Sequence, residues 1–408
     1  MRNGTPELLI IEPFLDGHHG AYVQWIVRGA IARGVSVRLA TSKDSVVHPH
    51  FRALQDEFKS DLMVLTLPEM QFQEMDKYDV WSLIKKEWYY FKLFRCFYRD
   101  NIAVMRPDVV MLPYLDYCIN VMAICGSPFG KTPLCGIAFR PAFHFKGMNI
   151  KAQDVRFSWA RKFLFLRLLA DPVVKTLFTM DDTLHRCVGN MKLESSAKLR
   201  CLPAPAELAG TVTRQAARRR LGIARETVCI LVYGAITARK GFDALLLAAS
   251  EGRFPENVHI ILAGRQDAWT TDFLASPAMR NLLASGRVHQ CNEFLDKDME
   301  NAVFAASDIV WLGYRGHSHG SGVLVQAGRM GLPVVACDDG LIGWLTRRGR
   351  FGVTVCIADM ESVVAGVNEM LRDKGQCALY GQNGWRFFAS HTPEHFSKAL
   401  FDSILTIP

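Results

Sequence analysis

Two glycine-containing loops hold the residues of this chain that are best suited to bind an anion. One loop ends at Arg239 and Lys240, and the other contains the turn Gly320-Ser321-Gly322, about eighty residues later. Glycine lets the backbone approach a ligand closely, and the unpaired N–H groups of a first helical turn favour negative charge. A lysine beside such a turn adds a full positive charge. The two loops therefore predict a site for a diphosphate group.

The elements that position the second loop can be predicted from the sequence. An apolar strand at Ile309 to Leu312 leads into the loop, and an amphipathic helix is expected from Val323 to Met330. Gly331 ends this helix, and Pro333 starts the next strand, PVVAC. In the alternative interpretation, the glycines only turn the chain and Ser321 caps a structural helix.

Composition is that of a globular protein of more than one domain. The chain has 408 residues, of which 50% are hydrophobic and 22% are charged. Its 11 cysteines form no C-x-x-C pair and no zinc-like spacing, so we expect core residues in a reducing compartment. Apolar runs are too short for a signal peptide or for the roughly 18 residues of a spanning helix. These features predict a cytoplasmic protein.

The first half is predicted to be a parallel, doubly wound sheet, because short apolar runs alternate with helical patterns. The predicted strands are Leu8 to Ile11, the run VSVRLAT, Asp108 to Leu112, Leu134 to Phe139, Val173 to Thr179 and Lys198 to Leu202. The carboxyl ends of parallel strands are where open α/β sheets bind ligands. Polar residues that follow these strands are therefore candidates for contact with a substrate.

Two groups of polar residues occupy such positions. Gly17, His18, His19 and Gly20 follow the first strand, and Arg140 and His144 follow the run that ends at Phe139. The planar fork of Arg140 suits a phosphate or a carboxylate. The alternatives are that the paired histidines are exposed turn residues and that Arg140 is an ordinary surface arginine.

Basic and aromatic residues are mixed in two segments of the first half. Residues 81–106 combine six Lys/Arg with eight Trp, Tyr or Phe, and residues 156–167 repeat this mixture. Residues 1–207 hold 27 Lys/Arg against 21 Asp/Glu, a net +6 of the total +8. Such helical faces suit an anionic membrane surface, and they also suit single-stranded nucleic acid or a core helix with snorkelling lysines. We expect membrane contact rather than nucleic-acid binding.

A domain boundary is expected near residue 206, after Pro203-Ala-Pro205. Beyond it, strands are predicted at Thr227 to Tyr233, Val258 to Ala263 and RVHQC, and a helix is predicted from Met299 to Ala306. The loop of Lys240 follows the first strand of this sheet, and the Gly320 turn follows its fourth. Both loops are therefore expected at one edge of a second Rossmann-like sheet.

This second half resembles the donor domain of the retaining glycosyltransferases of family 4, which have the GT-B fold. The resemblance rests on the loop Gly234-Ala-Ile-Thr-Ala-Arg239-Lys240-Gly241 and on GSGVLVQAGRMGLPVVA, and it is strongest from 228 to 356. It implies two Rossmann-like doubly wound domains that face a cleft: an acceptor-binding domain at 1–205 and a nucleotide-sugar donor domain at 206–385. The segment 386–408 would form a helix that returns to the first domain.

The resemblance also implies roles for individual residues. Lys240, Arg239 and Ser318 would act in catalysis. The donor would be bound by Gly234, Gly320, Ser321, Gly322, Gln326, His317 and His319. The family has two glutamates at the positions of Ser318 and Gln326, and Gln326 keeps hydrogen bonding to a ribose hydroxyl without the charge. The family often has an arginine at the position of Ala235. In this chain Arg239 would supply that positive charge instead.

Metal and cofactor requirements are expected to be absent. Asp296-Lys297-Asp298 matches the D-x-D pattern of metal-dependent glycosyltransferases, but it precedes a predicted helix, where acids act as caps. His317 and His319 lack a third ligand in the sequence and are expected near the sugar. Lys240, Arg239 and the amides of Ser321 and Gly322 would stabilise the negative charge that develops on a leaving diphosphate.

The sequence therefore predicts a metal-independent, retaining glycosyltransferase that uses a nucleotide diphosphate sugar. Its acceptor would be a glycan or a lipid-linked or polysaccharide-precursor molecule, and its location would be cytoplasmic, peripheral at the membrane. The alternatives are a sugar-nucleotide epimerase of related fold and a non-catalytic paralogue that binds sugar nucleotides. The sequence leaves open the sugar, the base, the acceptor and the oligomeric state.

Overall fold

The computed structural model describes residues 6–59, 61–69, 80–152, 157–208 and 212–405 of the chain. The chain forms two compact units, and each is described by itself. Unit 1 comprises residues 1–144, 155–203 and 393–408, and unit 2 comprises residues 145–154 and 204–392. The sequence-based boundaries differ from this division, since they place 145–154 in the first domain and 386–392 with the last helix.

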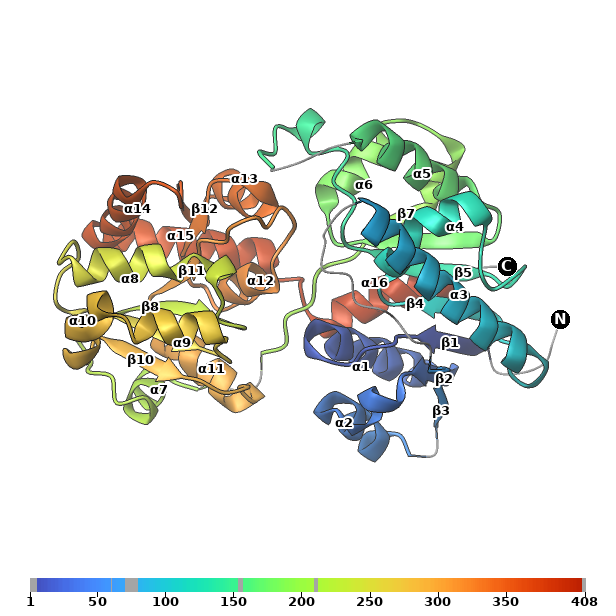
Figure 1. Cartoon of the computed structure of the whole chain (residues 1–408), viewed down its shortest axis with the longest axis horizontal. Coiled ribbons are helices and arrows are strands. Elements are labelled where there is room, and N and C mark those ends of the chain that lie inside the picture. The colour runs from blue at the N-terminus through green and yellow to red at the C-terminus, as the bar shows by residue number, and fades with distance from the viewer. Residues whose placement is uncertain (1–5, 60, 70–79, 153–156, 209–211, 406–408) are drawn as a thin grey trace. The chain divides into compact units, whose positions relative to one another are not determined.

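Unit 1 contains a seven-stranded parallel sheet in the order β3-β2-β1-β4-β5-β6-β7 (Figure 1). Its strands are β1 (Glu7–Ile11), β2 (Ser36–Thr41), β3 (Leu62–Thr66), β4 (Val109–Leu112), β5 (Leu134–Ala138), β6 (Val174–Thr179) and β7 (Leu199–Cys201). Its α-helices are α1 (Gly17–Ile31), α2 (Pro49–Glu57), α3 (Val80–Met105), α4 (Ile119–Cys125), α5 (Ser158–Ala170), α6 (Asp182–Gly189) and α16 (Pro393–Leu405).

Unit 2 contains a six-stranded parallel sheet in the order β10-β9-β8-β11-β12-β13. Its strands are β8 (Val228–Tyr233), β9 (Val258–Ala263), β10 (Val288–Cys291), β11 (Ile309–Leu312), β12 (Val334–Cys337) and β13 (Gly352–Val355). Its α-helices are α7 (Arg214–Arg220), α8 (Phe242–Ser250), α9 (Ala268–Leu274), α10 (Arg280–Ala284), α11 (Lys297–Ala306), α12 (Gly322–Arg329), α13 (Gly340–Gly349), α14 (Met360–Arg372) and α15 (Lys374–Phe388).

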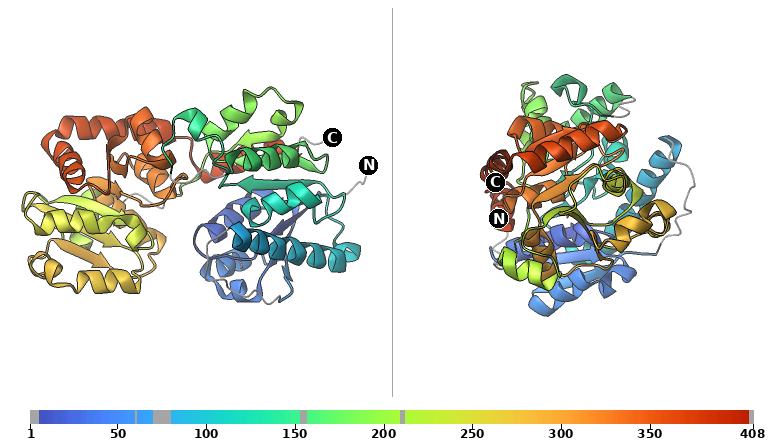
Figure 2. Two further views of the ribbon diagram at one scale, coloured as in Figure 1. Left: turned by 45° about the horizontal axis from the view of Figure 1, so that its top comes forward. Right: turned by 90° about the vertical axis from the view of Figure 1, so that its left-hand side faces the viewer.

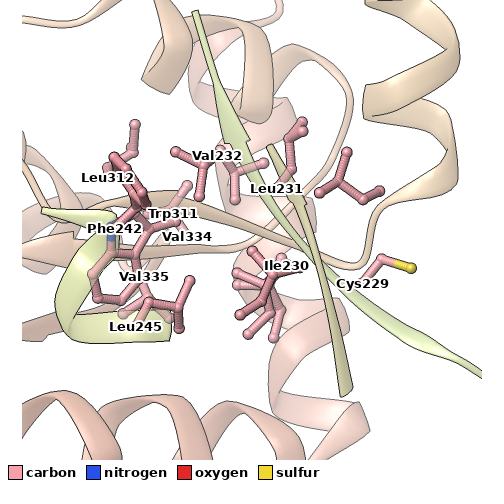
Figure 3. Packing of buried hydrophobic residues seen from close by; sticks show 14 of the residues in the cluster. Cys229, Ile230, Leu231, Val232, Phe242, Leu245, Trp311, Leu312, Val334 and Val335 are labelled. Carbon is pink, nitrogen blue, oxygen red and sulfur yellow. The ribbon is translucent and has the colours of Figure 1, made fainter. Parts of the chain in front are cut away.

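Helices cover both faces of the sheet in each unit (Figure 2). This explains why β8 and β11 are continuous apolar runs, since side chains on both faces of these strands are buried. Trp311 of β11 is fully buried in the core of unit 2. Phe242 and Leu245 of α8 lie close to it, with Val335 of β12 (Figure 3). The predicted fold class of two Rossmann-like parallel sheets is confirmed.

Three elements differ from the sequence-based expectation. Strands β3 and β13, each at the edge of its sheet, were not predicted. The run LMVL of β3 is apolar throughout, so its signal was present in the sequence, whereas GVTV of β13 contains only two apolar side chains. The single helix expected over 386–408 is not observed. Instead, α15 ends at Phe388 and a separate helix, α16, begins at Pro393. Proline favours the first turn of a helix and disfavours helical backbone in the preceding residue.

Helix α16 belongs to unit 1, where it packs against α1. A Cβ atom on Gly29 of α1 would lie 2.0 Å from Ser397 Oγ and 2.8 Å from a ring carbon of Phe401. The two helices therefore pack so closely that only glycine fits at this position. Arg33 reinforces the contact, since its guanidinium donates to Ser397 Oγ at 3.1 Å and lies over the Phe401 ring.

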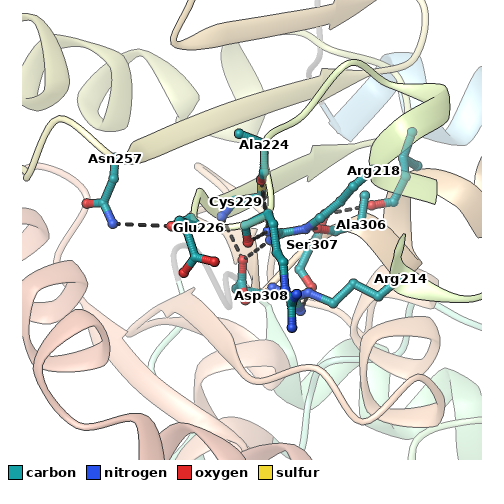
Figure 4. Close-up of polar contacts among 11 residues, drawn as sticks. Arg214, Arg218, Ala224, Glu226, Cys229, Asn257, Ala306, Ser307 and Asp308 are labelled. Atoms are coloured by element: carbon teal, nitrogen blue, oxygen red, sulfur yellow. Dashed lines mark hydrogen bonds and ion pairs between the residues drawn. The ribbon is translucent and has the colours of Figure 1, made fainter. Parts of the chain in front are cut away.

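A buried cation joins the amino ends of β8 and β11 in unit 2 (Figure 4). The guanidinium of Arg218 is paired with Asp308 Oδ2 at 2.8 Å and donates to the carbonyls of Ala224, Arg225 and Ala306. Asp308 Oδ2 also accepts the Cys229 N–H at 2.8 Å. Each polar group of this network has a partner, so the network fixes α7 to the sheet.

Candidate functional site

Lys240 lies at the carboxyl end of β8, in the short 3₁₀ turn Ala238–Lys240. The residue is only 6% exposed. Its Nζ donates to the carbonyl of Tyr233 at 2.7 Å and to the hydroxyl of Tyr314 at 2.8 Å, and it lies 4.4 Å from the centre of the Tyr314 ring. The ammonium is thus held by neutral oxygens and an aromatic face at the edge of the sheet.

Glycine at position 241 allows the Lys240 loop to touch the loop after β11. Gly241 has φ of +59°, and a Cβ atom there would lie 2.0 Å from the carbonyl oxygen of Gly313. The indole Nε1 of Trp311 donates to the Lys240 carbonyl at 3.0 Å. This hydrogen bond ties the Lys240 loop to strand β11. The sequence Lys-Gly is therefore a packing requirement as well as a source of charge.

Tyr314 connects Lys240 to the start of α12. Its hydroxyl lies 3.4 Å from Ser321 Oγ, and Ser321 is the N-cap of α12, accepting the Val323 N–H at 3.2 Å. Within the described part of the chain, no hydrogen bond is found from the amide of Ser321 or of Gly322. The structure therefore brings Lys240 and the glycine turn together, as the sequence predicted that they would lie at one edge.

Gln326 is buried inside α12 at 5% exposure. Its side-chain Nε2 is a buried atom without a hydrogen-bond partner among the described residues. Leaving a buried polar atom unsatisfied costs about 1–3 kcal/mol, so such atoms point to a polar ligand. The role of Gln326 toward a ribose hydroxyl stays a prediction.

Of the remaining donor-side residues, all but Gly234 lie in the loop between β11 and α12. The carbonyl of Ser318 accepts the Leu341 N–H at 2.9 Å, which ties the loop to α13. His317 Nε2 lies 3.0 Å from the Gly320 carbonyl, and the His319 ring contacts Phe145. Gly234 follows β8 directly, and a Cβ atom there would lie 3.3 Å from Lys240 Nζ.

Arg239 differs from Lys240 in that its side chain is exposed. Its carbonyl accepts the Arg315 N–H at 2.8 Å, and the Arg315 guanidinium pairs with Asp243 at 2.6 Å. Sequence reasoning missed Tyr314 and Arg315. Both directly follow β11 at the same edge as Lys240, so their position after a strand was the available signal.

The residues 145–152 pack onto the same end of unit 2. The ammonium of Lys151 pairs with Asp338 at 2.7 Å, and its carbonyl accepts the Gly340 N–H at the start of α13. Phe145 is fully buried. This contact was not predicted, because residues 145–152 are distant in sequence from α13.

In unit 1 the structure brings together His18, His19 and Arg140 at the carboxyl edge of the sheet. The His18 and His19 ring centres are 4.3 Å apart, and the Arg140 guanidinium lies 5.5 Å from the centre of the Tyr114 ring, which both histidines contact. Gly17, with φ of +54°, begins α1, and Gly20 is buried in its first turn. Desolvation, followed by His19, lowers the pKa of His18 to about 4.

His144 lies apart from this group in a buried network. Its Nε2 is 3.0 Å from Asp181 Oδ2 and 2.9 Å from Thr183 Oγ1, and Asp181 is the N-cap of α6. The hydrogen bond and the charge of His144 help to lower the pKa of Asp181 against the effect of burial. These contacts give His144 a structural role, and its predicted contact with a substrate stays a prediction.

The acidic pair of the D-x-D pattern lies at a helix start. Asp296 is the N-cap of α11, and its Oδ1 accepts the Met299 N–H at 2.7 Å. Asp298 lies in the first turn, where it complements the helix dipole. The expected capping role is confirmed. Within the described residues, no group of three or more metal-binding side chains is found.

The basic and aromatic segments form helices α3 and α5 of unit 1. Aromatic side chains lie exposed along both helices, with Trp81 at 71%, Trp159 at 74% and Phe163 at 61% exposure. Among the helices that the structure describes, none is long and apolar enough to cross a membrane. Residues 153–156, which overlap the second predicted segment, lie outside the described residues.

Comparison with known proteins finds matches to the part of the chain that contains Lys240 and the glycine turn. Residues 227–373 match the family described as Glycosyl transferases group 1. The D-inositol 3-phosphate glycosyltransferase of Rhodococcus jostii is 30% identical over 198 residues, which cover 47% of this chain and 43% of that protein. A second D-inositol 3-phosphate glycosyltransferase, from Catenulispora acidiphila, is 25% identical and matches over 54% of this chain and 58% of its own. The chain thus spans about half the length of the curated relatives it matches.

Solved structures share the fold over the whole chain. Sucrose-phosphate synthase from Thermosynechococcus elongatus has a TM-score of 0.70 at 13% identity, covering 98% of each chain. The Anabaena protein Alr3699/HepE in complex with UDP has a TM-score of 0.68 at 15% identity, covering 99% of this chain and 100% of that one. The chain therefore has a GT-B type of fold, and the match to the group 1 glycosyltransferases lies within its second unit.

Proposed function

We propose that this protein transfers a sugar from a nucleotide diphosphate sugar to a hydroxyl group of a lipid-linked or polysaccharide-precursor acceptor. The observation that carries the proposal is the chain of contacts from Lys240 Nζ through the Tyr314 hydroxyl to Ser321 at the start of α12. These contacts place a cation and a helix N-terminus at the carboxyl edge of one sheet. Such an edge is suited to a diphosphate.

The names of related proteins are in keeping with this donor. The Anabaena protein Alr3699/HepE has been solved with UDP and with UDP-glucose, and its fold is similar to that of this chain. The two curated relatives are named for transfer to an inositol phosphate. We therefore include a phosphorylated polyol among the acceptor classes to be tested.

The proposed reaction depends on charge that develops during transfer. As the bond between the anomeric carbon and the diphosphate oxygen breaks, the leaving diphosphate gains negative charge. Lys240 and the amides of Ser321 and Gly322 would stabilise this charge more strongly than they stabilise the bound donor. The proposal requires no metal ion for this step, and it follows the family resemblance in expecting retention of the anomeric configuration.

Replacement of Lys240 by alanine tests the proposal directly. We expect a loss of at least a hundredfold in transfer rate, about 3 kcal/mol of barrier, because the positive charge of Lys240 would no longer stabilise the leaving diphosphate. The measurement is nucleotide release from a nucleotide diphosphate sugar in the presence of acceptor. Lys198→Ala is a matched control, since Lys198 Nζ also donates to a carbonyl, that of Asp171 at 2.8 Å, but in unit 1. Equal rates for the two variants would contradict the proposal.

Dependence on an acceptor separates the enzyme classes. A glycosyltransferase releases nucleotide only when acceptor is present, whereas an epimerase converts the sugar nucleotide alone. The epimerase alternative has a structural counterpart, since the UDP-GlcNAc 2-epimerase of Neisseria meningitidis has a TM-score of 0.63 at 12% identity. Thermal-shift measurements with nucleotide diphosphates identify the base first, because a ligand that binds only the native state raises stability.

A peripheral membrane contact through α3 and α5 is the second part of the proposal. Helix α4 lies between α3 and α5 on one face of the sheet (Figure 1). Between residues 80 and 99, the only acidic side chain of α3 is that of Glu87, which is buried. Helix α5 contains no Asp or Glu. The outward faces therefore combine Lys and Arg with exposed tryptophan. This composition suits anionic lipid headgroups.

Vesicle binding tests this surface. We expect the protein to sediment with vesicles that contain phosphatidylglycerol and to remain in solution with pure phosphatidylcholine. The double variant Trp81→Ser/Trp159→Ser should reduce binding about tenfold or more, because burial of exposed aromatic surface in the headgroup region is lost. Trp385→Ser is the matched control, since Trp385 is 57% exposed on α15 of unit 2. Equal loss in the control would contradict a specific surface.

A further inference from the structure

A hollow of about 590 Å³ lies in unit 2, where the end of α13 meets one side of α15 (Figure 1). Phe351, which directly precedes β13, lines this hollow and is buried. The hollow is therefore at the amino end of β13, an edge strand of the sheet. Lys240 follows β8 at the carboxyl end of the same parallel sheet, so the hollow lies apart from the donor loops. We call it the arginine hollow.

Three arginines line the arginine hollow. Arg348 lies in the last turn of α13, Arg350 directly follows that helix, and Arg386 lies in the last turn of α15. Among the described residues, no Asp or Glu lines the hollow, although Glu369 lines an adjoining hollow that shares Arg350. The side chains of the three arginines form no ion pair and donate no hydrogen bond to any residue that the structure describes. Their positive charges are therefore not neutralised by the fold.

The helix ends do not account for these arginines. A basic side chain at a helix C-terminus commonly donates to the last carbonyls. Arg372 does this at the end of α14, where its Nε donates to the Asn368 carbonyl at 3.1 Å. The Arg348 guanidinium instead lies 5.1 Å from the centre of the Trp344 ring. This cation–π contact holds the guanidinium without using its N–H donors, which remain for an anion.

The backbone of Arg350 adds a second feature. Arg350 has φ of +51° and ψ of 53°, the left-handed conformation that a helix end normally gives to glycine. Its carbonyl accepts the Asn383 Nδ2–H at 3.1 Å, which ties α15 to this turn. Arginine is disfavoured in this conformation, because its Cβ atom crowds the backbone. Replacement of Arg350 by glycine therefore removes a cation without removing a stabilising backbone preference.

The other walls of the arginine hollow suit a ring that carries hydroxyl groups. Phe387 and Leu379 line it with apolar side chains that are 50% and 45% exposed. Asn383 uses its Nδ2 toward Arg350, so its Oδ1 is left to accept a hydroxyl group, and the half-buried Gln376 also lines the hollow. Small-molecule sites commonly combine apolar walls with a few polar groups in volumes of about 300–1,000 Å³. The arginine hollow has this composition and size.

We propose that the arginine hollow is a second ligand site of this chain and binds a phosphorylated sugar. The guanidinium groups of Arg348, Arg350 and Arg386 bind the phosphate, since the planar fork of arginine matches phosphate oxygens. The apolar face of the sugar ring packs on Phe387, and its hydroxyl groups contact the two amide side chains. The site requires neither a bound donor nor glycosyl transfer, so this inference is independent of the proposed function.

Calorimetric titration with glucose 6-phosphate tests the inference. We expect saturable binding, about tenfold weaker binding of inorganic phosphate and no binding of glucose at the same concentration. Arg348→Gln/Arg386→Gln should weaken glucose 6-phosphate binding tenfold or more, because charge-assisted hydrogen bonds to phosphate are lost. The matched control is Arg219→Gln/Arg220→Gln, which removes two exposed arginines from α7 of the same unit.

Three results of this titration would contradict the inference. Absence of saturable glucose 6-phosphate binding would overturn it, as would equal affinities of the Arg348→Gln/Arg386→Gln variant and its control. Equal affinities for inorganic phosphate and glucose 6-phosphate would remove the sugar from the assignment. Lys240→Ala should bind glucose 6-phosphate as the unchanged protein does. A loss of binding in Lys240→Ala would mean that the ligand occupies the donor loops instead.

Arg350→Gly separates ligand binding from a structural role. We expect about tenfold weaker binding of glucose 6-phosphate, while the thermal midpoint without ligand stays unchanged or rises by up to about 2 °C, because glycine accepts the left-handed backbone. A lower midpoint together with weaker binding would assign Arg350 to the structure of the turn and contradict the inference.

Hydrogen exchange of the backbone amides locates the site. Glucose 6-phosphate should slow exchange in residues 347–352 and 376–388, the two segments that line the arginine hollow. The loop 313–322 should exchange as it does without ligand. Slower exchange in 313–322 that is absent from the two segments of the hollow would overturn the inference.

Discussion

Arg218 and Lys240 are both buried cations next to the sheet of unit 2, at 4% and 6% exposure, but their surroundings differ. Arg218 lies at the amino ends of the strands and pairs with Asp308. Lys240 lies at the carboxyl end, where its Nζ contacts the Tyr233 carbonyl and the Tyr314 hydroxyl. In the described part of the chain, no carboxylate lies within ion-pair distance of Lys240. The positive charge of Arg218 is neutralised by the fold, whereas that of Lys240 remains to attract an anion.

Unit 1 repeats this contrast with negative charge. Burial raises the pKa of both Glu12 and Glu87. Amides at the start of α4 satisfy both oxygens of Glu87, while one oxygen of Glu12 has no partner among the described residues. In both units the fully satisfied charge is structural. The charge that the fold leaves incompletely satisfied lies at the carboxyl edge of its sheet, where ligands bind.

The largest expected effect comes from breaking the structural ion pair. Arg218→Ala should lower the free energy of unfolding by about 2–4 kcal/mol, because three carbonyls lose their donor and Asp308 keeps only its ion pair with the more exposed Arg214. Lys240→Ala should change the free energy of unfolding by no more than about 1 kcal/mol, since it removes two neutral hydrogen bonds but also a buried charge. Urea unfolding measures both. Similar costs for the two variants would remove the distinction between the cations.

The two glutamates provide the second test. Glu87→Gln should be the more costly of the two by about 1 kcal/mol, because the new amide nitrogen would face the side-chain amide of Asn120 and one hydrogen bond is lost, although the raised pKa of Glu87 reduces this cost as the pH rises. Glu12→Gln should be neutral or stabilising at pH 7. Because its folded pKa is raised, the carboxyl group disfavours folding once the pH exceeds its unfolded pKa. The stability gain of Glu12→Gln should therefore grow from pH 4 to pH 7, and a gain that shrinks would contradict this assignment.

Removal of the Tyr314 hydroxyl should give an intermediate effect. Tyr314→Phe keeps the aromatic face over Lys240 but breaks the link to Ser321, so we expect a stability cost of about 1 kcal/mol and a roughly tenfold slower transfer. The measurements are urea unfolding and nucleotide release. Tyr380→Phe is the control, because Tyr380 is half-buried on α15 in the same unit. Faster transfer in Tyr314→Phe would mean that Tyr314 restrains Lys240 instead of orienting it.

The smallest expected effect concerns Gln326. Gln326→Glu should leave nucleotide binding unchanged or tighten it by up to about 1 kcal/mol, about fivefold, because a carboxylate makes charge-assisted hydrogen bonds to hydroxyl groups. Calorimetric titration with nucleotide diphosphates measures this change. Gln290→Glu, on the exposed side of β10, is the control. A large loss of affinity would mean that α12 does not contact the ribose.

Much of the fold could be predicted from the sequence because its strands are continuous apolar runs. β1, β8 and β11 are buried on both faces, so their composition alone identifies them. Edge strand β3 also contains an apolar run, LMVL, that was not assigned, and edge strand β13, GVTV, gives a weaker signal because it is short and contains only two apolar side chains. The break between α15 and α16 was missed although Pro393 marks it, because the apolar pattern continues across the break.

By itself, the sequence determined which loops carry the charge and the glycines. Lys240 and Ser321 each follow a strand of one parallel sheet, and this order places them at the same edge whatever the side-chain packing. Only the tertiary structure decided which groups neutralise which charges. Glu12 and Tyr117 are 105 residues apart, and Lys240 and Tyr314 are 74 apart. Contacts at such separations depend on how the strands assemble, and no local pattern of residues encodes them.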